Sequence, residues 1–115
     1  MLDSLFNSPS ANLQEIQRDP REQESVDDET KHLALYHYES CIFSSRVRRA
    51  IQVLSLEIET RDILECHSHY EELQKHCGKT TVPCLRILEP KNNSSTWMFE
   101  SADIIAHLAR QFGRS

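Results

Sequence analysis

The sequence predicts an α/β fold in which a four-stranded mixed sheet has helices on both faces. Short apolar or aromatic runs of strand length alternate along the chain with segments whose apolar residues recur at helical spacing. Their order is β-α-β-α-β-β-α, and the strand–helix–strand start requires a right-handed parallel crossover. The last two strands lie close enough in sequence to form a hairpin. A chain of 115 residues suits one such domain with one core.

The first strand, helix and second strand follow one another from Leu33 to Ile63. Residues 33–38 form an apolar and aromatic run that is typical of a buried strand, and residues 39–41 form a turn. Helical spacing of apolar residues predicts a helix over 42–54, and alternation of charged with other residues predicts a half-buried strand over 57–63. The apolar positions of the helix are Phe43, Val47, Ala50, Ile51 and Leu54.

The remaining elements are a helix, two strands and a last helix. The first of these helices ends at Gly78, a residue type that commonly terminates helices. Strands are expected over 84–88 and 96–99, with a turn between them, and Ser101 is expected to cap the final helix. The apolar faces of the two helices consist of Tyr70, Leu73 and Cys77, and of Ile104, Ile105, Leu108 and Phe112.

Residues 1–31 differ in composition from residues 32–115. They are rich in Asp, Glu, Gln, Asn and Ser, and they contain Pro9 and Pro20. We therefore expect a polar N-terminal arm that is mobile or loosely docked, followed by the domain over residues 32–115. The first apolar residues of the arm either anchor it to a partner or a membrane surface, or form a short helix on its own domain. They are Leu2, Leu5 and Phe6.

The composition excludes several functional classes. The formal net charge of −5 argues against a nucleic-acid partner. The chain has no apolar stretch of about 18 residues, so no transmembrane segment is expected. The first twenty residues lack a basic start followed by an apolar run, and we expect a cytoplasmic protein.

The four cysteines do not indicate a disulfide framework or a metal site. A reducing cytoplasm keeps most thiols free. Cys66 and Cys77 share one expected helix and are about 16 Å apart along it, beyond the reach of a disulfide. No close Cys-x-x-Cys pair is present, and the six histidines are scattered, so no metal is expected.

Cys41 is the candidate nucleophile, because it lies where a strand ends and a helix begins. Unpaired N–H groups and the positive end of a helix dipole stabilise a thiolate at that position, and the thiolate is the reactive form. Arg46, Arg48 and Arg49 add positive charge on the same helix if they face the loop. The alternative is a buried structural cysteine.

Two further segments are candidates for ligand binding. Pro83 follows Val82 between a loop and a strand, and a cis bond there would turn the Val82 backbone outward to pair with an extended peptide. The alternative is an ordinary trans turn proline. Glu100 and Ser101 precede the last helix, whose N-terminus can bind a carboxylate, while Glu100 can accept from an ammonium group. Alone, this pair is a helix cap.

Together these segments resemble glutaredoxins and the N-terminal domain of glutathione transferases, which share the thioredoxin-like fold. The matching stretches are LALYHYESCIFSSRVRR at 33–49, TVPCLRI at 81–87 and WMFESADIIAHL at 97–108. The resemblance implies that Cys41 is the nucleophile and Pro83 the cis-proline. It also implies that Val82 pairs with the glutathione backbone and that Glu100 and Ser101 hold its γ-glutamyl group.

The sequence departs from the glutaredoxin pattern in ways that bear on function. Ser44 replaces the resolving cysteine, Tyr38 stands where many glutaredoxins have a lysine, and Ile42 replaces the glycine of cluster-carrying relatives. We therefore expect a monothiol, glutathione-dependent thiol–disulfide oxidoreductase that acts on glutathionylated protein thiols. The alternatives are a non-catalytic module that binds glutathione or a partner, and a [2Fe–2S] carrier. Cys84 is expected to belong to the core.

Overall fold

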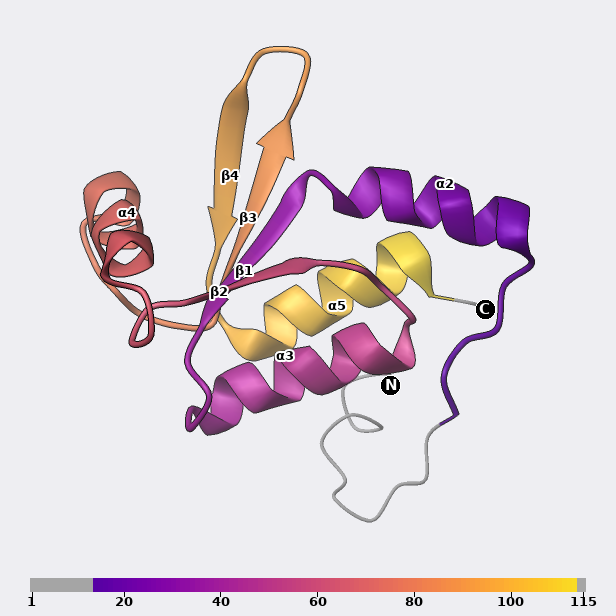
Figure 1. Cartoon of the computed structure of the whole chain (residues 1–115), viewed down its shortest axis with the longest axis horizontal. Helices are drawn as coiled ribbons and strands as arrows, with labels where there is room; N and C mark the ends of the chain where they lie inside the picture. Colours follow the sequence, from indigo (N-terminus) through magenta and orange to yellow (C-terminus); the bar gives the residue numbers. More distant parts are fainter. Residues whose placement is uncertain (1–13, 114–115) are drawn as a thin grey trace.

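The computed structural model describes residues 14–113 and confirms the predicted α/β architecture (Figure 1). A four-stranded sheet has the order β2-β1-β3-β4. The elements are α2 (Pro20–Thr30), β1 (Leu33–His37), α3 (Ile42–Val53), β2 (Glu59–Asp62), α4 (His67–Cys77), β3 (Cys84–Glu89), β4 (Ser94–Met98) and α5 (Ser101–Phe112).

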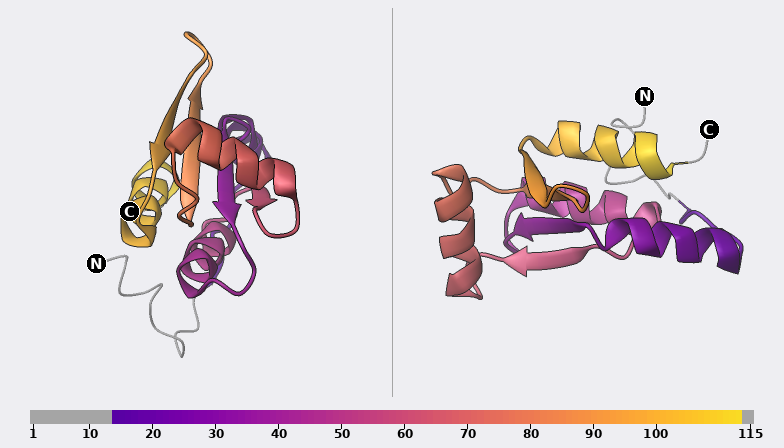
Figure 2. Two further views of the ribbon diagram at one scale, coloured as in Figure 1. Left: turned by 90° about the vertical axis from the view of Figure 1, so that its left-hand side faces the viewer. Right: turned by 90° about the horizontal axis from the view of Figure 1, so that it is seen from above.

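The sheet is mixed, as the order of elements predicts. β1 pairs in parallel with β2 and antiparallel with β3, and β3 and β4 form an antiparallel hairpin. The ladder of this hairpin continues to the pair Glu89–Ser94, so the turn is shorter than expected and β4 begins two residues earlier. α3 and α5 cover one face of the sheet, whereas α4 lies on the other (Figure 2).

Alternate residues of β1 supply two separate core clusters, because successive side chains of a strand point to opposite faces. Leu33 and Leu35 pack with α3 and α5 in the larger cluster. Ala34 and Tyr36 pack with Leu73 of α4 in the smaller one. Every residue of β1 is therefore buried, as expected for a central strand.

A half-buried polar network fixes α4 to the sheet. The Tyr36 hydroxyl donates to the Glu72 carboxylate, and Arg61 Nη1 donates to both groups at 2.7 Å. Burial, followed by the Glu72 hydrogen bond, raises the pKa of Tyr36 to about 12. The network joins β1, β2 and α4 near the C-terminal ends of the two strands, and Cys41 follows the end of β1.

The C-terminal part of the expected arm is a docked segment that includes helix α2. Asp19 caps this helix by accepting from the Glu22 N–H group at 2.9 Å, and Pro20 occupies its first turn. Before the helix, Ile16 N donates to Val53 O at 2.8 Å. Residues 14–31 are thus tied to the domain, while the anchor expected at Leu2, Leu5 and Phe6 lies outside the described residues.

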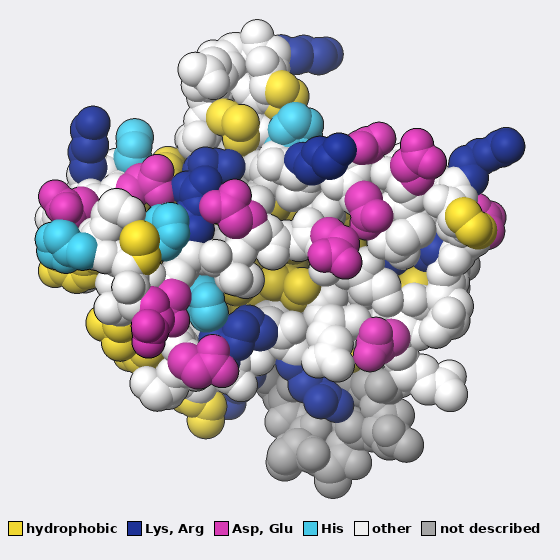
Figure 3. Space-filling model, in the orientation of Figure 1, with side chains coloured by type: hydrophobic (Ala, Val, Ile, Leu, Met, Phe, Trp, Pro, Cys, Tyr) yellow, Lys and Arg dark blue, Asp and Glu magenta, His cyan; other side chains and the backbone are white. Residues whose placement is uncertain are grey.

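Figure 3 shows acidic side chains over α2 and histidines gathered over α4. Among residues 14–113, no helix is long and apolar enough to cross a membrane.

Candidate functional site

Strand register places the three predicted site segments at one edge of the sheet. Tyr36, near the end of β1, pairs with Cys84, the first residue of β3. Leu85 in turn pairs with Met98 at the end of β4. The connections that follow β1, precede β3 and follow β4 therefore converge at this edge, where α3 and α5 also begin (Figure 1). Cys41, Val82–Pro83 and Glu100 lie on these three connections, and Ser101 is the first residue of α5.

Cys41 is the N-cap residue of α3, and its side chain is 9% exposed. Its sulfur accepts the Ser44 N–H group at 3.5 Å. Burial raises the pKa of the Cys41 thiol, but hydrogen bonds from Ser44, from the Phe43 N–H group and from the Tyr38 side chain outweigh burial and lower the pKa overall. The Ser44 hydroxyl lies close to the sulfur without a hydrogen bond of ordinary geometry, so the Ser44 N–H group is the firmer contact. Cys41 is therefore a buried thiol at a helix N-terminus, and its pKa is lowered.

The Val82–Pro83 peptide bond is cis, which confirms that expectation. Pro83 is buried and Val82 is half-buried. Val82 packs against the smaller core cluster together with Tyr38 and Phe99. Val82 and one residue near each of the other two site segments thus contact one shared group of core side chains.

Glu100, and not Ser101, is the N-cap of α5, which corrects the expected cap. The helix begins at Ser101, and no side chain caps it. Glu100 has φ 70°, a left-handed conformation that costs a residue with a Cβ roughly 1–3 kcal/mol. Its carbonyl accepts from Ile104 N at 3.0 Å, while its side chain is exposed. The helix N-terminus, with its positive dipole end, therefore faces the sheet edge without a side-chain cap.

Among the other three cysteines, Cys66 differs from Cys77 and Cys84, and all four are free thiols. Cys84 is fully buried, as expected, and burial, followed by the neighbouring Cys77, raises its pKa to about 12. Burial also raises the pKa of Cys77. The pKa of Cys66 is lowered by the Ser68 side chain, whose hydroxyl is 3.0 Å from the Cys66 sulfur, and by the His69 N–H group.

Sequence reasoning missed Cys66, which is the N-cap of α4. The signal was present as a cysteine at a helix start, the same signal that identified Cys41. Cys66 follows the end of β2 by four residues, just as Cys41 follows the end of β1. The two thiols of lowered pKa therefore occupy equivalent places after two parallel strands.

Two large apolar side chains are exposed immediately after Cys41. Ile42 is 65% exposed and Phe43 is 51% exposed. The Arg46 guanidinium lies over the Phe43 ring, 5.4 Å from its centroid. The surface of α3 immediately after Cys41 is thus apolar.

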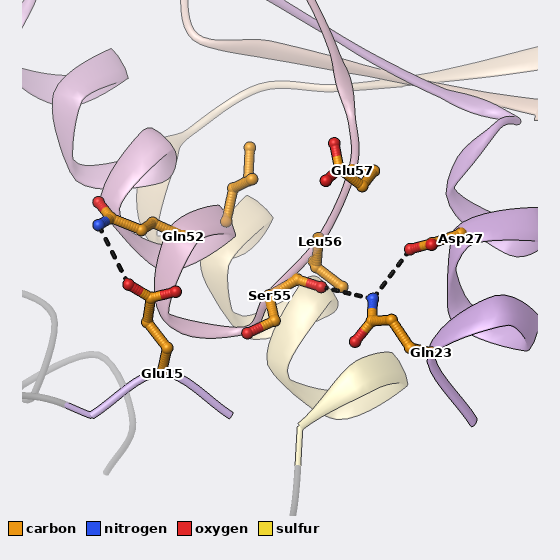
Figure 4. A pocket seen from close by; sticks show the side chains of 8 residues that line it. Glu15, Gln23, Asp27, Gln52, Ser55, Leu56 and Glu57 are labelled. Carbon is orange, nitrogen blue, oxygen red and sulfur yellow. Dashed lines mark hydrogen bonds between the residues drawn. The ribbon is translucent and has the colours of Figure 1, made fainter. Parts of the chain in front are cut away.

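A pocket of about 340 Å³ lies at the opposite end of α3 and contains none of the predicted site residues. Figure 4 shows hydrogen bonds among the polar groups that line it, and each of these bonds involves a residue of the docked N-terminal segment. Gln52 donates to Glu15 at 3.4 Å, and Gln23 donates to Asp27 at 2.8 Å and to Ser55 O at 2.9 Å. We interpret this pocket as part of the docking of residues 15–27, apart from the site at Cys41. Among residues 14–113, no group of three or more His, Cys, Asp or Glu side chains is arranged to hold a metal ion.

Comparison with known proteins finds one family. Residues 35–115 match the family described as glutathione S-transferase, N-terminal domain. No curated protein matches the chain.

Similar folds occur in solved structures of glutathione transferases and of a maleylacetoacetate isomerase. A maleylacetoacetate isomerase from Anaeromyxobacter dehalogenans, with dicarboxyethyl glutathione and citrate in its active site, is 23% identical with a TM-score of 0.52. An epsilon-class glutathione S-transferase from Musca domestica is 22% identical, and glutathione transferase Omega 2C from Trametes versicolor is also 22% identical, both with TM-scores of 0.57. The matches cover 70%, 72% and 70% of this chain, but only 36%, 36% and 38% of those three proteins, respectively.

Proposed function

Because the chain belongs to the glutathione S-transferase N-terminal domain family, we propose that it binds glutathione at the sheet edge beside Cys41. The observation that carries the proposal is the Cys41 thiol, which caps α3 at that edge and has a lowered pKa. The edge also provides an extended segment at Val82 and the uncapped N-terminus of α5.

Each part of glutathione has a chemically suitable group at this edge. The N–H groups of the α5 N-terminus and the Ser101 hydroxyl are donors for the γ-glutamyl carboxylate. The Glu100 carboxylate is an acceptor for the γ-glutamyl ammonium group. The Val82 backbone can pair with the peptide part as an added strand would. These contacts would place the glutathione sulfur towards Cys41.

The reaction that this arrangement supports best is removal of glutathione from protein mixed disulfides. The Cys41 thiolate attacks the glutathione sulfur, a Cys41–glutathione disulfide forms, and the protein thiolate leaves and takes a proton. The thiolate of a second glutathione then attacks the glutathione sulfur bound to Cys41. Glutathione disulfide and the Cys41 thiolate are the products. The cycle therefore needs no resolving cysteine, and Ser44 can occupy that position without blocking the reaction. The exposed Ile42 and Phe43 would contact the protein part of the substrate.

Two measurements on the full chain test this function. We expect calorimetric titration with reduced glutathione to show binding in the wild type and in Cys41→Ser, and weaker binding in Ser101→Ala. We expect Cys41→Ser to abolish deglutathionylation of a mixed-disulfide peptide, because it lacks the nucleophile, whereas Cys84→Ser retains it. Full activity of Cys41→Ser would contradict the mechanism, and absence of glutathione binding would contradict the site.

A non-catalytic glutathione-binding module is the second candidate, and the buried Ser44 fits it as well as it fits the monothiol reaction. Ser44 is buried at the position of a resolving cysteine, so the chain cannot close a disulfide within its own motif. This candidate predicts a glutathione titration like that of the proposed enzyme but no turnover of the mixed-disulfide peptide. A [2Fe–2S] carrier is distinguished from both by the visible spectrum after anaerobic reconstitution.

A further inference from the structure

The connection between β1 and α3 is held by one side chain from α3 itself. Arg48 lies two turns along the helix from Cys41, and its guanidinium reaches back towards the end of β1. Arg48 Nη2 donates to Glu39 O at 3.1 Å, and Arg48 Nη1 lies 3.4 Å from Tyr38 O. Arg48 Nη1 also lies 2.9 Å from His37 Nδ1. Three consecutive residues before Cys41 therefore contact one guanidinium.

The same connection sets the position of the Cys41 sulfur. Cys41 N donates to Tyr38 O at 3.2 Å, so the carbonyl that accepts from Arg48 also accepts from Cys41. The hydrogen bonds that lower the Cys41 pKa come from the helix tip and from Tyr38, on the two sides of this turn. A change in the turn would move the sulfur relative to both sets of donors.

We propose that Arg48 is a positioning residue for Cys41, which acts by clamping residues 37–39 and thereby fixing the sulfur on the N–H groups of α3. The proposal rests on the reactive role assigned to Cys41 above. Arg46 provides a contrast, because it carries the same charge two residues nearer to Cys41 but lies over Phe43. The clamp requires the N–H groups of Arg48 to reach residues 37–39, and a positive charge elsewhere on the helix is not enough.

The clamp also requires a neutral His37. A guanidinium can only donate, so His37 Nδ1 must accept and the ring proton must lie on Nε2. Burial, followed by the charge of Arg48, lowers the pKa of His37, whereas the charges of Asp62 and Glu39 oppose this shift. Protonated His37 would turn a donor towards Arg48 and release the clamp. Cys41 reactivity would then fall in acid for a reason besides its own protonation.

The test is the rate of Cys41 alkylation by iodoacetamide as a function of pH, followed by mass spectrometry of the peptide that contains Cys41. We expect Arg48→Met to lower the rate at pH 7 by about tenfold and to raise the apparent pKa of the thiol, because a small displacement of a reacting group is costly. Arg48→Lys, which keeps one donor, should be intermediate. The matched control Arg46→Met should stay within about twofold of wild type, because it removes charge without touching the turn.

A second variant tests the clamp if Arg48→Met does not fold. His37→Gln keeps an acceptor for Arg48 but cannot be protonated. We expect the ratio of its alkylation rate to that of the wild type to be constant above pH 7 and to rise as the pH falls below 6. Equal rates and thiol pKa values in Arg48→Met and Arg46→Met, or a ratio that does not change with pH, would overturn the proposal. The assay needs no glutathione, so its failure is distinct from failure of the proposed function.

Discussion

The two ends of helix α3 have hydrogen-bond partners of opposite kinds: a sulfur acceptor at the N-terminus and a charged donor at the C-terminus. At the N-terminal end, the Cys41 sulfur accepts the Ser44 N–H group at 3.5 Å. At the C-terminal end, Arg18 Nη1 donates to Leu54 O at 2.8 Å and to Ser55 O at 3.3 Å. Arg18 Nη2 donates to Phe112 O at 2.8 Å, so one guanidinium joins the ends of α3 and α5.

The partner at the C-terminal end of α3 stabilises the fold, whereas the partner at the N-terminal end is a candidate reactive group. A permanently charged guanidinium satisfies helix carbonyls strongly, and its pairing favours a single structure. A thiol is a weak acceptor that interacts more strongly with the N–H groups once it has lost its proton. Arg18 also lies outside residues 35–115, which match the family, whereas Cys41 lies within them. The side chain at the C-terminal end of α3 therefore comes from outside the part of the chain that matches the family.

The largest expected effect concerns the reactivity of the four cysteines. We expect iodoacetamide at pH 8 to label Cys41 and Cys66 long before Cys84. With a pKa of about 12, only roughly one Cys84 thiol in 10,000 is ionised at that pH. Peptide mass spectrometry over time measures the order. Early labelling of Cys84 in the folded protein would contradict the assignment of the reactive thiols to helix N-termini.

The next largest effect concerns the C-terminal end of α3. Arg18→Met should lower the free energy of unfolding by about 2 kcal/mol, because buried carbonyls at two helix ends lose a charged donor. The Cys41 alkylation profile should not change, since the two ends are separate. Arg21→Met, at an exposed position of α2, is the matched control and should be nearly neutral. Urea unfolding of the three proteins gives the comparison, and equal stabilities would show that the Arg18 contacts contribute nothing.

Most of the fold and the location of the site could be predicted from local signals. The apolar run at 33–38 and the helical spacing after Cys41 are short-range patterns, and the crossover rule fixes how they assemble. The convergence of the three candidate segments was predictable because β1, β3 and β4 bring them to one edge of the sheet whatever the details of packing. The helix over 20–30 also had a local signal, Asp19–Pro20, but the polar composition around it favoured an arm.

The features that were not predictable depend on tertiary contacts. Arg18 acts on carbonyls 36 and 94 residues away, and nothing in its neighbourhood indicates this. The backbone conformation of Glu100 follows from how β4 enters α5, so a cap was assigned to Ser101 instead. Arg46, Arg48 and Arg49 were equivalent in sequence, and only the fold shows that Arg48 faces the turn.

A smaller effect is expected at Glu100. This residue is the N-cap of α5, the position that Cys41 occupies in α3. Glu100→Gly should raise the free energy of unfolding by about 1 kcal/mol, because glycine adopts positive φ without strain. It should also weaken glutathione binding, because the carboxylate is lost. Asn93→Gly, at φ 53° in the hairpin turn, is the control and should leave binding unchanged. Calorimetry and urea unfolding measure both properties, and tighter glutathione binding by Glu100→Gly would contradict the proposed role of this residue.

The smallest effect is expected from acid, which acts on the N-terminal end of α3 through His37. Its pKa in the folded protein is lowered, chiefly by burial and then by the charge of Arg48, so the unfolded chain binds this proton more readily. Stability should therefore be unaffected by His37 above its ordinary pKa of about 6.5 and should decrease as the pH falls below that value. Asp62 and Glu39 partly offset the shift, which keeps the effect small. His37→Gln should flatten the stability profile between pH 7 and 5, whereas Arg18→Met should shift the whole profile downward without changing its slope. If His37→Gln leaves the slope unchanged, the acid sensitivity lies elsewhere, and the burial-lowered pKa of His107 is the first alternative to test.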